Sequence, residues 1–245
     1  MRWVLLAGFW VGALAPAGSS ADGGTSRPDP GEFHFVRMIY ADAADAPGYG
    51  RRGWWQQDMP EAEEHFTQNL ARLTRVSTGE PVALALTDAQ LFEYPWLYAT
   101  QTGYWDLSDA ELDRLREYLL RGGFLMADDF WGEDDWEVFA ATMARLFPTR
   151  PMEELHGDDA ILHVVYSIDE FTQIPGLRHL GRLQELPPPH WYGIYDDQRR
   201  LMVGINYNQD VGDSWEEANN PRYPEPMTAL GYRFGVNYVV YAMTH

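Results

Sequence analysis

The chain has 245 residues, and its hydrophobic content of 45% with 14% aromatic residues excludes an intrinsically disordered chain. It contains no Cys, and all 18 basic residues are Arg, which excludes thiolate nucleophiles, disulfides, Cys metal ligands and Schiff-base lysines. A net charge of −19 disfavours nucleic acid and anionic membranes as partners and favours cations.

The N-terminus has the pattern of a secretory signal peptide. Arg2 is followed by an apolar run from Trp3 to Ala17, and the small residues Gly18–Ala21 follow it. We expect a signal peptide over 1–21, cleaved after Ala21 or, as a second choice, after Ala17. An uncleaved anchor is the alternative. The mature protein is then periplasmic or secreted, with no membrane insertion after cleavage.

After a flexible leader at residues 22–31, the pattern predicts one α/β domain over residues 32–245. The run Phe33–Ala41 is rich in β-formers and predicts the first strand, followed by a loop to Asp58. Pro60 with acidic residues behind it marks a helix start. Short apolar runs at Val82–Leu86 and Trp96–Ala99 predict two more strands.

The central part of the chain alternates helix and strand. The capping box Ser108–Glu111 opens a helix that ends at Gly122-Gly123. The apolar strand Phe124–Ala127 follows at once and stops at Asp128-Asp129. A further helix begins at Asp134 or Asp135 and ends before Pro148. Alternating strands and helices predict a mainly parallel sheet.

The last third adds three expected elements. Ile161–Ile168 is predicted to be a strand. Ile194-Tyr195 and Leu201–Tyr207 flank a polar turn and predict a hairpin added to the sheet. Met227–Met243 is predicted to be a helix.

The clearest candidate site lies where the strand Phe124–Ala127 ends. Ligands of open α/β sheets bind beyond the carboxyl ends of strands, and here Asp128, Asp129 and Trp131 follow the strand. Adjacent residues on a strand face opposite sides, so one aspartate, or both in a turn, would face the crevice. Carboxylates are ligands for hard cations, which makes a divalent cation the candidate cofactor, with Asp128, Asp129 and Asp210 as candidate ligands.

A second candidate group follows the last strand of the hairpin. It combines oxygen-bearing side chains with one aromatic ring: Asn206, Asn208, Asp210, Asp213, Trp215 and Glu216. Such a group fits a metal or a sugar, and it equally fits a polar turn capped by its own side chains.

A third candidate group lies in the loop after the first strand. The loop contains Arg51, Arg52, Trp54 and Trp55, which belong to the residue types that anchor ligands and interfaces. The alternative interpretation is a lid packed on the sheet.

Several segments resemble the bacterial family of domains of unknown function numbered 4159. They are Arg37–Trp55, Tyr94–Tyr98, Leu107–Asp129, Asn206–Asp210, Gly212–Glu216 and Asn237–Tyr241. The resemblance implies a class I glutamine amidotransferase-like fold, which is a flavodoxin-like three-layer sandwich. Catalytic amidotransferases carry a Cys on a strand-to-helix elbow, which this chain cannot supply, so the resemblance implies that amidotransferase chemistry is lost.

Two functions remain open from the sequence. The first is a non-catalytic binding domain whose acidic, aromatic crevice takes a ligand or a protein partner. The second is a carboxylate-metal-dependent hydrolase that uses Asp128, Asp129 and Asp210. The second requires three converging ligands and an open coordination position, so the distances between these oxygens decide between the two.

Overall fold

The computed structural model describes residues 31–48, 52–169 and 171–245. The expected signal peptide and nearly all of the expected leader lie outside the described residues. In the described ranges, none of the helices combines the length and the apolar character needed to cross a bilayer.

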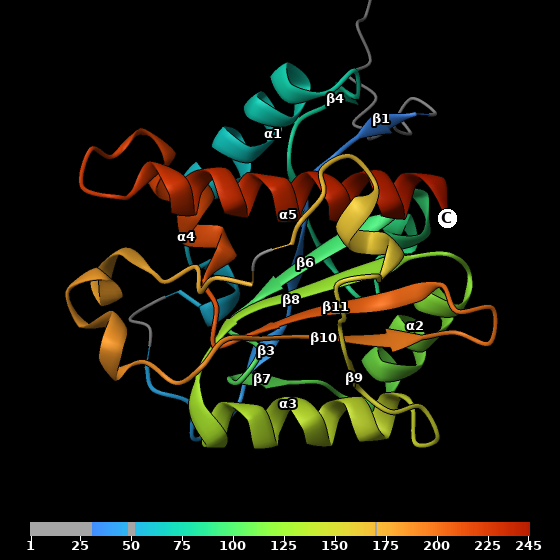
Figure 1. The fold of residues 1–245 in the computed structure, drawn as a ribbon. Coiled ribbons are helices and arrows are strands. Elements are labelled where there is room, and N and C mark those ends of the chain that lie inside the picture. The colour runs from blue at the N-terminus through green and yellow to red at the C-terminus, as the bar shows by residue number, and fades with distance from the viewer. Residues whose placement is uncertain (1–30, 49–51, 170) are drawn as a thin grey trace, which may run out of the picture.

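A mostly parallel sheet forms the centre of the molecule (Figure 1). In the described part of the chain it has seven strands, in the order β5-β2-β6-β8-β11-β10-β9. Their bounds are Val36–Ile39 (β2), Val82–Ala85 (β5), Trp96–Thr100 (β6), Phe124–Phe130 (β8), Glu153–Glu154 (β9), His190–Tyr195 (β10) and Leu201–Tyr207 (β11). Five adjacent strands, β5, β2, β6, β8 and β11, run parallel to one another. Strand β10 is antiparallel to β11, and β9 is antiparallel to β10.

Helices cover both faces of this sheet (Figure 1). Those on one face are α1 (Glu61–Leu73), α4 (Val211–Glu216) and α5 (Glu225–Thr244). Those on the other are α2 (Asp109–Leu120) and α3 (Gly132–Leu146). Each layer buries its own apolar cluster against the sheet. The arrangement is a mixed α/β fold and is compatible with three layers.

Short elements complete the fold. Two strand pairs lie outside the main sheet: β1 (Glu32–Phe33) with β4 (Ser77–Thr78), and β3 (Ala41–Asp42) with β7 (Trp105–Asp106). The 3-10 helices are η1 (Trp54–Gln56), η2 (Ala89–Glu93), η3 (Ala160–His163), η4 (Leu177–Glu185) and η5 (Glu217–Asn219).

The strand order reverses between β2 and β6. From β2 the chain moves outward to β5, and it then returns to the other side of β2 to form β6. Such a switch point opens a crevice at the carboxyl ends of the strands. The loops after β2, β6, β8 and β11 therefore converge at one edge of the sheet.

Most of the expected elements are confirmed. The capping box forms, because the Glu111 amide donates to Ser108 Oγ and the Ser108 amide donates to Glu111 Oε2 at 2.9 Å. The hairpin and the C-terminal helix also form. Helix α3 starts at Gly132, two residues before the expected Asp134, and Asp135 accepts the amide of Trp131 at its start.

The expected strand at Ile161–Ile168 is wrong. This segment contains η3 and no strand, although Ile161, Leu162 and Ile168 are buried. Asn237 on α5 takes the place of a strand partner: its side chain accepts the amides of Val165 and Tyr166. Apolar spacing alone does not distinguish such a segment from a strand, because both bury alternate residues.

Candidate functional site

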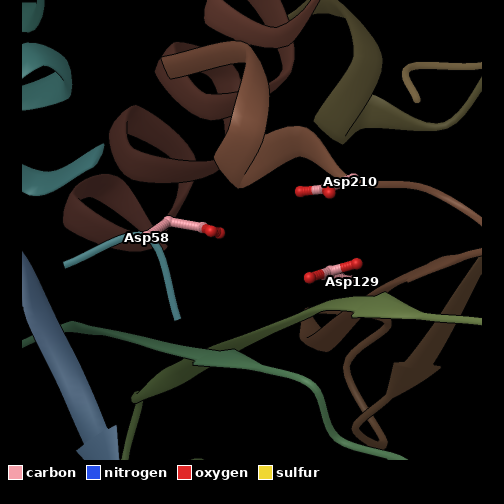
Figure 2. A group of neighbouring side chains, drawn as sticks. All are labelled: Asp58, Asp129 and Asp210. Carbon is pink, nitrogen blue, oxygen red and sulfur yellow. The ribbon is translucent and has the colours of Figure 1, made fainter. Parts of the chain in front are cut away.

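Five acidic side chains meet at the carboxyl edge of the sheet. They come from the loop before α1 (Asp58), from β8 (Asp129) and from α4 or its N-cap (Asp210, Asp213 and Glu216). Oxygens of Asp58, Asp129 and Asp210 all lie within 4.8 Å of one another, and so do oxygens of Asp58, Asp213 and Glu216. Figure 2 shows the first three side chains directed at a common space. We call these five residues the acidic cluster.

A β-bulge places Asp129 in the acidic cluster. Strand β8 continues through both aspartates, and its register with β11 shifts between Ile205 and Tyr207. Such a bulge redirects a side chain, and Asp129 has a φ of +50°. Its carboxylate accepts hydrogen bonds from Gln101 Nε2 and from Trp131 Nε1. Asp129 therefore faces the acidic cluster, while Asp128 does not belong to it.

Asp58 is the least satisfied member of the acidic cluster. It is only 5% exposed, and its Oδ1 accepts from Gln57 Nε2 at 2.6 Å. Its Oδ2 is buried and has no hydrogen-bond partner in the described structure. A buried carboxylate oxygen without a donor is costly, which makes this atom available to a ligand.

Backbone conformation at this edge is unusual. Five non-glycine residues in the described ranges have a positive φ, and four of them lie at this edge of the sheet: Asp58, Gln101, Asp129 and Asn208. Non-glycine residues in this region carry strain, which clusters at functional sites.

Burial and mutual repulsion raise the pKa values in the acidic cluster. Desolvation, then Asp213 and Asp129, raise the pKa of Asp58 well above its usual value, and the pKa of Asp210 rises in the same way, with Asp129 as the first neighbour. Burial raises the pKa of Asp213 to about 8 and that of Glu216 to about 7. These carboxylates cannot all be ionised without a compensating cation.

The carboxyl groups lie in two close pairs. Asp210 lies beside Asp129, and Glu216 lies beside Asp213, so each group influences the pKa of its neighbour.

Arg178 lies at the mouth of the acidic cluster. Its Nη2 is 4.0 Å from Asp129 Oδ1, and its side chain is 55% exposed. Beside it opens a pocket of about 560 Å³ lined by Gln101, Trp131 and Tyr104 among others. Because Gln101, Trp131 and Arg178 all contact Asp129, this pocket is separated from the acidic cluster by one layer of side chains.

Asp128 has a structural role beneath the acidic cluster. Its carboxylate accepts hydrogen bonds from four groups: Tyr98 Oη, Asn206 Nδ2 and the amides of Val211 and Gly212. Burial raises its pKa to about 7, followed by repulsion from Asp129. Asp128 therefore anchors the start of α4 to the sheet, and its oxygens are already occupied.

We expect Asp128→Asn to destabilise the fold. One oxygen would become an amide group facing donors, which costs about 1–3 kcal/mol for an unsatisfied buried group. Thermal unfolding should show a melting temperature lower by roughly 3–10 °C, at about 2–4 °C per kcal/mol. The control Asp109→Asn, at a side chain 95% exposed, should stay close to wild type. An unchanged melting temperature in Asp128→Asn would contradict the anchoring role.

The model of one protein family covers most of this chain. It describes a domain of unknown function, DUF4159, and matches residues 35–243. The chain belongs to this family. No curated protein matches the chain.

The structure brings together only part of the residue set expected for the DUF4159 domain. Asp129, Asp210, Asp213 and Glu216 meet in the acidic cluster, and Trp131 contacts Asp129 at 2.8 Å. The sequence analysis names Asp128 as a candidate metal ligand. The structure places Asp128 below the cluster instead, with both of its oxygens in hydrogen bonds.

Trp215 is a second correction. It is fully buried and packs against Phe66, with ring centroids 4.3 Å apart. Helix α4 turns this side chain toward α1 and α5 while it presents Asp213 to the cluster. Its role in the DUF4159 domain is core packing.

The loop group also lies apart from the acidic cluster. Trp54 packs on Tyr104 at 4.8 Å, its backbone amide donates to Asp42, and neither Trp55 nor the exposed Arg52 lines the pocket. The interpretation of this loop as a packed lid fits its two tryptophans better than ligand binding does.

Two residues of the site were absent from the sequence prediction. Asp58 stands at the end of the loop predicted after the first strand, and Arg178 lies outside the elements predicted from the sequence. The only sequence signal for Asp58 is its place before Pro60 and α1, at the end of the loop that follows the first strand.

Proposed function

We propose that this DUF4159 domain is a non-catalytic binding domain whose ligand site is organised by a divalent cation. The observation that carries the proposal is the convergence of Asp58, Asp129 and Asp210, all buried, with Asp58 Oδ2 lacking a donor. Hard cations such as Ca²⁺, Mg²⁺ and Mn²⁺ prefer carboxylate oxygens. The absence of Cys agrees with a fold that lacks the amidotransferase nucleophile.

The spacing of the oxygens supports this ligand class. Two oxygens on opposite sides of Ca²⁺ lie about 4.6–5.2 Å apart, and around Mg²⁺ about 4.0–4.2 Å, given the usual bond lengths. The three oxygens lie within 4.8 Å of one another. Small movements of side chains would therefore bring them to coordination distance.

Titration calorimetry with Ca²⁺, Mg²⁺ and Mn²⁺ in roughly 0.15 M salt tests the proposal, because this ionic strength screens the diffuse attraction of a chain with charge −19. Wild type should bind in about the micromolar range, as sensor sites do. Asp129→Asn should weaken binding by at least about 100-fold, since even residues behind the ligands are worth 10–100-fold.

The control for this titration is Asp113→Asn, which changes the charge equally at a side chain 74% exposed and paired with Arg116. It should bind as wild type does. Equal heats for wild type and Asp129→Asn would overturn the proposal.

The pocket beside Arg178 favours a second function, a carboxylate-metal-dependent hydrolase. Such an enzyme needs room for substrate next to the metal, and the pocket of about 560 Å³ lies one side chain away from Asp129. Hydrolysis of nitrophenyl phosphate and nitrophenyl acetate with Mn²⁺ tests it. Turnover that requires Mn²⁺ and disappears in Asp129→Asn would establish the hydrolase. If neither compound is turned over, the hydrolase is excluded for these substrates and the binding function is retained.

We further propose the flavodoxin-like, amidotransferase-like class for this fold and export of the mature domain. The mostly parallel sheet with helices on both faces supports the first. The apolar run behind Arg2 supports the second. Fractionation of expressing bacteria, with sequencing of the mature N-terminus, tests export, and an N-terminus that retains Met1 in the cytoplasm would contradict it.

A further inference from the structure

We infer that the acidic cluster holds two divalent cations, with the carboxylate of Asp58 bridging them. The inference rests on the proposed cation among Asp58, Asp129 and Asp210. It adds a second position among Asp58, Asp213 and Glu216. The oxygens of this second group also lie within 4.8 Å of one another, so both positions meet the same distance requirement.

Asp58 is suited to a bridge. A carboxylate offers about four lone-pair sites, and the carboxylate of Asp58 accepts only one hydrogen bond, from Gln57 Nε2, in the described structure. Asp58 is only 5% exposed, so solvent does not provide a hydrogen bond to Oδ2. A bridging carboxylate uses one oxygen for each cation, and the cations of such pairs lie about 3.5–4 Å apart.

Two glycines allow the carboxylates to crowd together. A Cβ at Gly212 would lie 3.1 Å from Asp58 Oδ2. A Cβ at Gly176 would lie 2.5 Å from Asp210 Oδ2 and 2.9 Å from Asp213 Oδ2. The lack of a side chain at Gly176 and Gly212 therefore allows the two groups of ligands to lie close together.

The charge of the acidic cluster matches two divalent cations. Five carboxylates and the guanidinium of Arg178 leave four negative charges when all are ionised. One divalent cation would leave two of these charges in a site whose aspartates are at most 8% exposed, which is costly. Two divalent cations neutralise the site. Arg37 does not alter this balance, because it is paired with Glu63.

Equilibrium dialysis of the full chain with Mn²⁺ in roughly 0.15 M salt, followed by electron paramagnetic resonance, tests the inference. We expect two Mn²⁺ per chain and a spectrum of exchange-coupled ions in place of the six-line signal of isolated Mn²⁺. One bound Mn²⁺ would overturn the inference and leave the proposed function intact. No bound Mn²⁺ would overturn both, and two uncoupled ions would exclude the Asp58 bridge.

Glu216→Gln assigns the second position. It should bind one Mn²⁺ with the isolated six-line signal, while Glu64→Gln, with the same charge change on the exposed face of α1, should bind two. Two bound ions in Glu216→Gln would overturn the assignment. Circular dichroism checks the fold of each variant, and Asp213→Asn replaces Glu216→Gln if that variant does not fold.

Discussion

The metal-free domain should become less stable as the pH rises from 5.5 to 8, and a divalent cation should restore it. Folding raises the pKa values of Asp213 to about 8 and of Glu216 and Asp128 to about 7, because the groups are buried near other carboxylates. In the unfolded chain the same groups titrate near pH 4. Between these values the folded state holds protons that the unfolded state releases.

The sign of the pH dependence follows from linkage. Where the folded state binds more protons, the free energy of unfolding falls as the pH rises. The stability that these protonated groups contribute is fully present below about pH 4 and is lost as the pH rises through about 7–8. For a domain of this size each kcal/mol moves the melting temperature by about 2–4 °C, so we expect a decrease of roughly 5 °C or more in the presence of a chelator.

A cation should act most strongly at high pH. At 100 times its dissociation constant a ligand contributes about 2.7 kcal/mol, which corresponds to roughly 5–10 °C. At pH 5.5 protons compete for the same oxygens, so the gain should shrink to less than half. Differential scanning calorimetry at both pH values, with Mn²⁺ or chelator, measures these changes. A metal-free melting temperature that rises between pH 5.5 and 8 would contradict the account of the acidic cluster.

Local sequence signals were enough for most of the secondary structure. The Ser108–Glu111 capping box and the Gly122-Gly123 stop each act within a few residues, so the local pattern determined the element. The strand prediction for Ile161–Ile168 failed because the conformation of this segment depends on a distant contact. Its hydrogen-bond partner is the side chain of Asn237, more than 70 residues away.

The site was predictable in position and only partly in composition. The rule that ligands bind at the carboxyl edge points to Asp129 and Asp210, whose oxygens the structure brings within 4.8 Å of each other. It could not separate Asp128 from Asp129, because that depends on a bulge opposite Asn206. It also missed Asp58, which the topology brings to the cluster from the loop after β2. Trp215, which the sequence analysis groups with the oxygen-bearing residues, lies in the core.

A buried ion pair holds the loop that carries Asp58. Arg37 on β2 is fully buried, and its Nε lies 2.5 Å from Glu63 Oε1 on α1. Its Nη1 donates to the carbonyl of Gln57 at 2.9 Å and, more weakly, to that of Trp55 at 3.4 Å. The guanidinium also lies 4.8 Å from the centre of the Tyr98 ring. Arg37 is therefore a positioning residue for Asp58, which directly follows Gln57.

Arg37→Met should have the largest effect on stability of the substitutions considered. It leaves Glu63 buried without a cation, and breaking a buried pair in this way costs about 3–5 kcal/mol. The melting temperature should fall by roughly 6–20 °C, at about 2–4 °C per kcal/mol. Arg121→Met removes a surface pair with Glu117 at a side chain 62% exposed, and it should cost at most about 1 kcal/mol.

The double variant Arg37→Met with Glu63→Leu separates stability from positioning. Replacing both partners of a buried pair by apolar residues is often neutral or stabilising, so most of the melting temperature should return. The carbonyls of Trp55 and Gln57 would still lack their donor, so Asp58 would be held less tightly and cation affinity should stay about 10–100-fold below wild type, as for other residues behind metal ligands. Calorimetry on the single and double variants measures both quantities. Full recovery of cation affinity in the double variant would show that Arg37 stabilises the core without positioning Asp58.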